Sequence, residues 1–155
     1  MNSDALVISQ QTRQLTEFEI GNIKRHPEYG AKLVEASQQI QPYIPMILGH
    51  HRFYNDKEGY PIDYSYKNHE NPLLVNILQL ADSLDAATDS VGRSYAKTKS
   101  LDEILKEFSH ERGVRYNAIL VNMMQKDANF QEKLNQILTQ GREEICYEIY
   151  KEYTI

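Results

Sequence analysis

The chain has 155 residues, of which 41% are hydrophobic and 25% charged, a balance that suits one folded domain with its own core. A formal net charge of −5 argues against binding to a nucleic-acid polymer. No stretch approaches the roughly 18 apolar residues of a membrane span. The single cysteine, Cys146, excludes an internal disulfide and a Cys-based zinc site, and favours a reduced, cytoplasmic setting.

The first helices are marked by their starts. Thr16 and Glu19 have the spacing of a capping box, so a helix is predicted to begin after Leu15. Pro27 suits the first turn of a second helix, which places His26 at the N-terminal side of that helix.

The next helix is short and apolar, and ends in the adjacent histidines His50 and His51. A polar loop over 52–70 follows, and loops of this length are often functional. Asn71 and Pro72 then open a helix that is apolar on most sides, which we expect to be the central helix of the fold.

The second half of the chain is also helical in pattern. Ser100 and Glu103 form another capping box, opening a helix over 101–109. A further helix is predicted over 117–125 and a long amphipathic one over 130–150, in which Cys146 is expected to be a small buried residue. No long alternating strand occurs, so the predicted fold class is all-α.

The adjacent histidines allow two interpretations. On a helix they point about 100° apart, so they cannot chelate one metal ion as an i, i+4 pair would. At the end of a helix they can still serve one metal site, together with His26. The alternative is a surface pair, or a partly buried pair held by hydrogen bonds.

Asp82 and Asp85 interrupt the apolar helix. A buried carboxylate costs several kcal/mol unless it is paired or ligates a metal, and Asp82 follows the deepest part of the apolar run. The alternative, stronger for Asp85, is that the carboxylate caps a neighbouring helix or pairs with a lysine. Three imidazoles and a carboxylate suit a first-row transition metal, which can activate water for phosphoester hydrolysis.

The order of several segments resembles the HD-GYP family, all-α metal-dependent phosphohydrolases related to HD domains. The resemblance lies in LTEFEIGNIKRHPEYGAKLVE, in ILGHHRFYNDKEGYP with its His-His and Gly-Tyr-Pro signature, and in LQLADSLDAATD with its Ala-Asp-x-x-Asp-Ala pattern. GRSYAKTKSLDEIL and RGVRYNAILV also match in type and order. The resemblance runs from Leu15 to Val121 and implies an HD-domain-like helical bundle.

The resemblance implies a metal site and a substrate. Its metal ligands would be His26, His50, His51 and Asp82, holding iron or manganese, and its substrate would be cyclic di-GMP or a related cyclic dinucleotide. Residues linked to substrate handling would be the signature loop and two basic residues further on: Gly59, Tyr60, Pro61, Arg93 and Lys97.

Two departures from the family pattern shape the expected function. The chain has no His-Asp dipeptide, and Arg52 puts a cation beside the expected metal site, where the family usually has a glutamate. We therefore expect an N-terminally incomplete helical bundle. Its parts would be an N-terminal segment at 1–14, a helical domain at 15–125, and a C-terminal helix over 126–155 that either packs on this domain or serves as a linker.

These departures leave the question of enzymatic activity open. One interpretation is an incomplete or degenerate cyclic di-GMP phosphodiesterase domain, with a metal site that is absent or partial. The other is a noncatalytic signalling module that binds a cyclic dinucleotide or a protein partner through its Gly-Tyr-Pro loop. Clustered tyrosines would also suit a homo-oligomer, although semi-buried packing explains them as well.

Overall fold

The computed structural model describes residues 13–89 and 97–153. Within these ranges every regular element is a helix, and β-structure is limited to isolated bridges. The elements in chain order are α2 (Glu17–Ile23), α3 (His26–Val34), the 3-10 turn η1 (Gln41–Tyr43), α4 (Ile44–Gly49), α5 (Pro72–Thr88), α6 (Leu101–His110), α7 (Ala118–Lys126), α8 (Ala128–Gln136), the π-helical segment η2 (Ile137–Gly141) and α9 (Arg142–Tyr153). The prediction of an all-α fold is confirmed.

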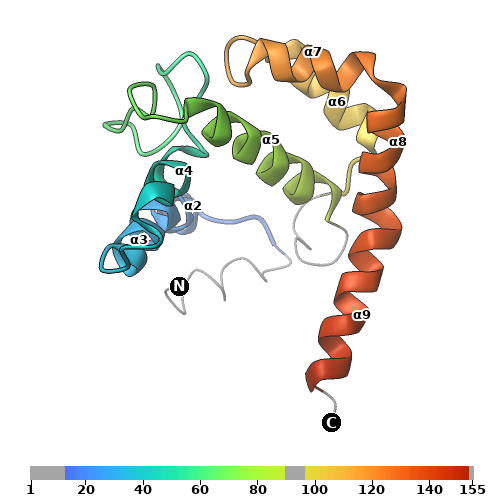
Figure 1. Ribbon diagram of the computed structural model, residues 1–155, viewed down its shortest axis with the longest axis horizontal. Coiled ribbons are helices and arrows are strands. Elements are labelled where there is room, and N and C mark those ends of the chain that lie inside the picture. Colours follow the sequence, from blue (N-terminus) through green and yellow to red (C-terminus); the bar gives the residue numbers. More distant parts are fainter. Residues whose placement is uncertain (1–12, 90–96, 154–155) are drawn as a thin grey trace.

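Helix α5 is the central element. It crosses the middle of the molecule, with α2, α3 and α4 at one side and α6 and α7 at the other, while α8, η2 and α9 form a long rod at the edge (Figure 1). One face of α5 nevertheless stays open, because Leu73, Leu74 and Ile77 are exposed. No helix in the described ranges has the length and apolar content needed to cross a membrane.

The predicted helix starts are present. Thr16 and Ser100 each accept a hydrogen bond from the backbone N–H three residues on. The carboxylates of Glu19 and Glu103 in turn accept one from the backbone N–H of Thr16 and Ser100, so both capping boxes are complete. Asn117 caps α7 through the N–H groups of Ile119 and Leu120. These caps are decided locally, which is why the sequence predicts them well.

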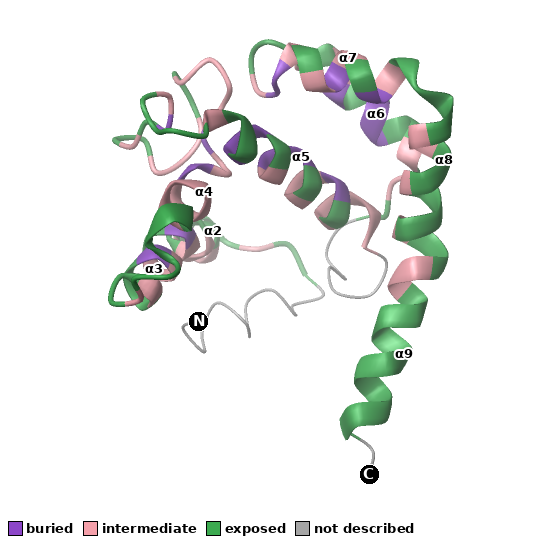
Figure 2. Ribbon diagram, in the orientation of Figure 1, coloured by how far each residue is buried: buried purple, intermediate pink, exposed green. Residues whose placement is uncertain are grey.

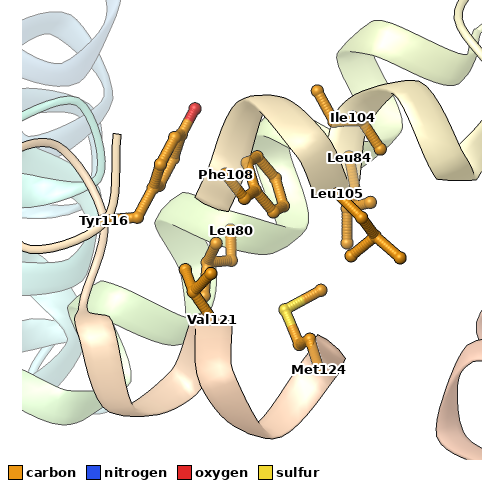
Figure 3. Packing of buried hydrophobic residues seen from close by; sticks show 8 residues of the cluster. All are labelled: Leu80, Leu84, Ile104, Leu105, Phe108, Tyr116, Val121 and Met124. Atoms are coloured by element: carbon orange, nitrogen blue, oxygen red, sulfur yellow. The ribbon is translucent and has the colours of Figure 1, made fainter. Parts of the chain in front are cut away.

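The main core lies between α5, α6 and α7 (Figure 2). Phe108 and Val121 are fully buried at its centre, and Phe108 packs against Tyr116 with ring centres 4.4 Å apart. Figure 3 shows the cluster, which consists of Leu80, Leu84, Ile104, Leu105, Phe108, Tyr116, Val121 and Met124. This core fixes α5 against α6 and α7 through Leu80 and Leu84. The histidine-bearing segments meet α5 through other residues, at Val75, Gln79 and Asp82.

The C-terminal rod is only partly packed. Phe130, Leu134 and Leu138 contact the core from α8 and η2, whereas Ile145 and Ile149 of α9 are exposed. The expectation that Cys146 is buried is wrong, because α9 extends beyond the bundle and leaves the thiol exposed (Figure 1). Apolar periodicity identifies a face of a helix, but it does not tell what covers that face.

Candidate metal and phosphate site

Two of the predicted metal ligands stand at helix ends. His26 is the first residue of α3, and its Nδ1 donates to the carbonyl of Ile23 at the end of α2, at 2.8 Å. His50 caps the C-terminus of α4, and its Nδ1 donates to the carbonyl of Ile47, also at 2.8 Å. Both imidazoles thus satisfy carbonyls that a helix end leaves without partners.

These two hydrogen bonds fix the tautomers of both rings. A carbonyl oxygen only accepts, so each Nδ1 carries the proton and each Nε2 of a neutral ring presents a lone pair. The two Nε2 atoms face each other at 3.0 Å. Two lone pairs at this distance need a shared proton or a cation between or beside them.

The third histidine completes a cluster. One ring nitrogen from each of His26, His50 and His51 can be chosen so that all three lie within 4.8 Å of one another. The ring centres of His50 and His51 are 4.2 Å apart, and those of His26 and His51 are 4.9 Å apart. Adjacent histidines converge here because His50 ends α4 and His51 lies beyond it, as the sequence argument requires.

Asp82 contributes a carboxylate at the edge of this cluster. Its Oδ2 lies 3.9 Å from Nε2 of His51, and its side chain is 35% exposed. The expectation that Asp82 is deeply buried is therefore wrong, because α5 turns this face toward an open cleft. Asp85 is an ion-pair partner, as the alternative interpretation held, but its carboxylate pairs with Arg142 of α9, at 2.6 Å, and not with a lysine.

Gly49, directly before His50 and His51, lets the end of α4 approach α5 closely. A Cβ on Gly49 would lie 2.9 Å from Cγ1 of Val75 and 3.1 Å from Cβ of Tyr66, closer than side chains pack. The end of α4 therefore presses directly on α5. This contact brings the turn that carries His50 and His51 beside α5, where Nε2 of His51 lies 3.9 Å from Oδ2 of Asp82.

The electrostatics favour a neutral His50. Burial lowers the pKa of His50; the carboxylate of Asp82 opposes this shift, and the nearby His26 adds to it. A neutral imidazole is the form that binds a metal ion. Facing lone pairs 3.0 Å apart also suit two ligands of one ion, since each would lie about 2.1 Å from it. The donor set, nitrogen-rich with one carboxylate, fits a first-row transition metal.

The Gly-Tyr-Pro loop folds back onto the histidines. Gly59 has φ of 86°, and a Cβ there would overlap the carbonyl oxygen of His51. Tyr60 stacks on His51, with ring centres 4.4 Å apart, and the Tyr60–Pro61 peptide bond is cis. Gly59 and Tyr60 line the same cleft as the histidines, whereas Pro61 shapes the turn beside it.

The sequence predicted that Arg52 places a cation beside the metal site, and this prediction is wrong. Its side chain is only 3% exposed, and its guanidinium donates to the carbonyls of Asp56 at 2.7 Å and Gly59 at 3.3 Å. It does not line the cleft. The positive charge expected beside the metal site is instead used to hold the loop. Gln79 of α5 secures this arrangement by donating to the Arg52 carbonyl at 2.8 Å.

The cleft has a volume of about 860 Å³ and runs from the histidines along α5 to α6. Basic side chains reach it from several segments: Lys24, Lys97, Lys99 and Arg115. Lys99 is paired with Glu107 at 2.7 Å. Lys97 lines the cleft, and its contact with a substrate phosphate stays a prediction; Arg93 falls outside the described residues.

Sequence reasoning missed several residues of this cleft. Gln79 and Ser83 flank Asp82 on α5, and helical spacing alone could have identified Gln79 as one turn away. Phe53 and Arg115 have no such signal, because only the tertiary fold brings the loop after α4 next to the loop before α7. Backbone bonds from Tyr54 N–H to the Arg115 carbonyl, 2.9 Å, join these loops.

Comparison with known proteins gives concordant relatives. The chain is similar to the cyclic di-GMP phosphodiesterase response regulator RpfG of Xanthomonas campestris pv. campestris (strain 8004), with 34% identity over 102 residues, which is 64% of this chain and 26% of RpfG. It is also similar to the cyclic di-GMP phosphodiesterase PA4108 of Pseudomonas aeruginosa, with 27% identity over 100 residues, which is 64% of this chain and 23% of that protein.

The chain therefore spans about a quarter of the length of these curated relatives. No solved structure matches it. A family model described as HD domain matches residues 3–120, a range that contains the histidine cluster, the Gly-Tyr-Pro loop and all of α5. Since this match covers most of the chain and agrees with the HD-GYP resemblance of its motifs, the chain belongs to the HD domain family.

Proposed function

We propose that this chain is a metal-dependent phosphohydrolase domain that acts on cyclic di-GMP with iron or manganese. The observation that carries the proposal is the facing pair of Nε2 atoms in His26 and His50, at 3.0 Å with both tautomers fixed. The cleft beside this pair is wide enough for a nucleotide and carries basic side chains. The two relatives, both named as cyclic di-GMP phosphodiesterases, support the choice of substrate.

Each residue of the site has a distinct task under this proposal. His26, His50 and His51 hold the metal through ring nitrogens, and Asp82 supplies a carboxylate beside them. When bound, such a metal polarises a phosphate and lowers the pKa of water. Tyr60 keeps the His51 ring in place by stacking on it, and Lys97 offers positive charge to a phosphate in the cleft.

The first test is metal content and hydrolysis in the same preparations. The purified chain, after incubation with Mn²⁺ or Fe²⁺ and removal of free ions, is analysed for metal and then assayed with cyclic di-GMP. We expect bound metal and a linear or mononucleotide product in the native chain, and neither in His50→Ala. His69→Ala is the matched control, because the His69 side chain is exposed, bonds to Tyr64 through its ring, and does not line the cleft. Equal metal content in both variants would refute the site.

A noncatalytic signalling module is the second candidate. The sequence contains no His-Asp dipeptide, and within the described ranges the histidine cluster is the only group of three or more metal-binding side chains. One carboxylate, that of Asp82, lies near this cluster, 3.9 Å from His51. Binding of cyclic di-GMP without product formation by the metal-loaded chain would favour this candidate over the first. Binding of a protein partner or self-association through the Gly-Tyr-Pro loop would belong to it as well.

A further inference from the structure

Arg115 belongs to the loop between α6 and α7, which forms one end of the cleft, and its backbone is held in place there. Its backbone N–H donates to the Glu111 carbonyl at 2.9 Å, and its own carbonyl accepts from Tyr54 N–H at 2.9 Å. The neighbouring carbonyl of Val114 accepts from Asn55 N–H at the same distance. The residue is thus held between α6 and the loop that leads to Gly59, with little freedom to move along the cleft.

The side chain of Arg115 is also organised. Its guanidinium lies 5.4 Å from the ring centre of Phe53 and 5.1 Å from that of Tyr116, and both rings line the cleft with it. The side chain is 39% exposed. Among its five N–H groups, only Nη1 has a partner in the described part of the chain, the Glu111 carboxylate at 3.4 Å. Most of the N–H groups of the guanidinium are therefore available to a ligand.

The side chains around the Arg115 guanidinium favour a nucleotide base over a phosphate as its ligand. An arginine can bind a phosphate or the O6 and N7 acceptors of guanine through two parallel hydrogen bonds. The Glu111 carboxylate, 3.4 Å away, opposes a second anion there but tolerates a neutral base. The aromatic rings of Phe53 and Tyr116 add an apolar wall that suits a flat base. Adenine would place its N6 amino donor against the guanidinium, whereas guanine places an acceptor there.

We propose that Arg115 binds the O6 and N7 edge of a guanine whose nucleotide phosphate lies at the histidine cluster. Arg115 would then be a specificity-determining residue that makes the cleft prefer guanine nucleotides over adenine nucleotides. The inference rests on the proposed function, because it takes the cleft as the site of a cyclic dinucleotide. The volume of about 860 Å³ accommodates a ligand that extends from the histidines to Arg115.

The test is calorimetric titration of the full chain, in the presence of Mn²⁺, with cyclic di-GMP and separately with cyclic di-AMP. We expect the native chain to prefer cyclic di-GMP, and Arg115→Gln to lose roughly 5- to 150-fold in affinity for it. The affinity for cyclic di-AMP should change little, so the variant should lose the preference for cyclic di-GMP over cyclic di-AMP. Arg112→Gln is the control, since Arg112 lies in the same loop, bonds to Asn122 at 3.1 Å and does not line the cleft.

Each other outcome has a definite meaning. An equal loss of affinity for both dinucleotides would show that Arg115 contacts phosphate, and unchanged affinities would show no contact; either result overturns the inference while the proposed function stands. Failure of the native chain to bind either dinucleotide overturns both. Arg115→Met is a second variant that keeps the packing against Phe53 and Tyr116, in case Arg115→Gln does not fold; its expected result is the same loss of preference.

Discussion

His26 and His50 present their Nε2 atoms to each other at 3.0 Å, while the Nδ1 atom of each ring donates to a helix-end carbonyl. This relationship constrains the chemistry of the site more than the number of histidines does. Each ring is already fixed by its outer hydrogen bond, as metal-bound imidazoles usually are. A cation can therefore bind with little reorganisation of either side chain.

The first prediction concerns thermal stability. A metal that binds only the folded chain should raise Tm, by an amount equivalent to about 2.7 kcal/mol when its concentration is 100 times Kd. We expect Mn²⁺ to raise the Tm of the native chain and a chelator to reverse the effect. In His26→Ala the increase should disappear. Thermal unfolding followed by circular dichroism measures both, and an unchanged Mn²⁺ response in His26→Ala would contradict this role.

The second prediction compares two glycines with positive φ. Gly59 and Gly113 have φ of 86° and 78°, but a Cβ would overlap the His51 carbonyl only at Gly59. Gly113→Ala should cost about 1–2 kcal/mol from the backbone conformation alone. Gly59→Ala should cost more, about 2–4 kcal/mol, because the loop must also move. Urea unfolding of both variants measures the difference, and equal costs would show that the overlap is relieved without penalty.

The sequence predicts the helices because their signals are local. The capping boxes at Thr16 and Ser100 and the proline start of α5 each depend on residues a few positions apart. The meeting of the histidines is different, since it depends on the contact of Gly49 with Val75 and hence on the packing of α4 against α5. The family resemblance indicated that the histidines share one site, but nothing in the sequence indicated the contact of Gly49 with Val75. The role of the histidines as ligands remains a prediction.

The errors share one physical cause. An apolar run suggested that Asp82 is buried and that Cys146 is covered, yet Asp82 borders a cleft and Cys146 is exposed. Arg52 was expected beside the metal and instead bonds to the carbonyls of its own loop. In each case, the neighbouring segment decides the environment, and a single sequence does not say which segment that is.

The third prediction tests the core. Phe108 is fully buried among residues of α5, α6 and α7, whereas Phe18 of α2 is 78% exposed. Phe108→Ala should lower the free energy of unfolding by about 3–5 kcal/mol, the sum of lost burial and a cavity. Phe18→Ala is the matched control and should change it by less than about 0.5 kcal/mol. Chemical unfolding gives both values, and a similar cost for the two variants would mean that Phe18 is covered in solution.

The last prediction concerns acid stability at the start of α2. Hydrogen bonds from Arg13 and from Thr16 lower the pKa of Glu19 from 4.5 to about 2. Because the folded-state pKa is the lower one, the unfolded chain binds this proton more readily. The stabilisation is therefore complete above pH 4.5 and is lost as the pH falls from 4.5 toward 2.

Glu19→Gln removes this titration and keeps the shape of the side chain. We expect the variant to be less stable than the native chain at pH 6, and this difference to shrink progressively as the pH is lowered below 4.5. Glu17→Gln, one helical position from the cap on the same helix, is the control for losing a negative charge in the first turn. The comparison requires urea unfolding at a series of pH values. A stability difference for Glu19→Gln that stays constant down to pH 3 would mean that the bonds from Arg13 and Thr16 do not hold this carboxylate ionised.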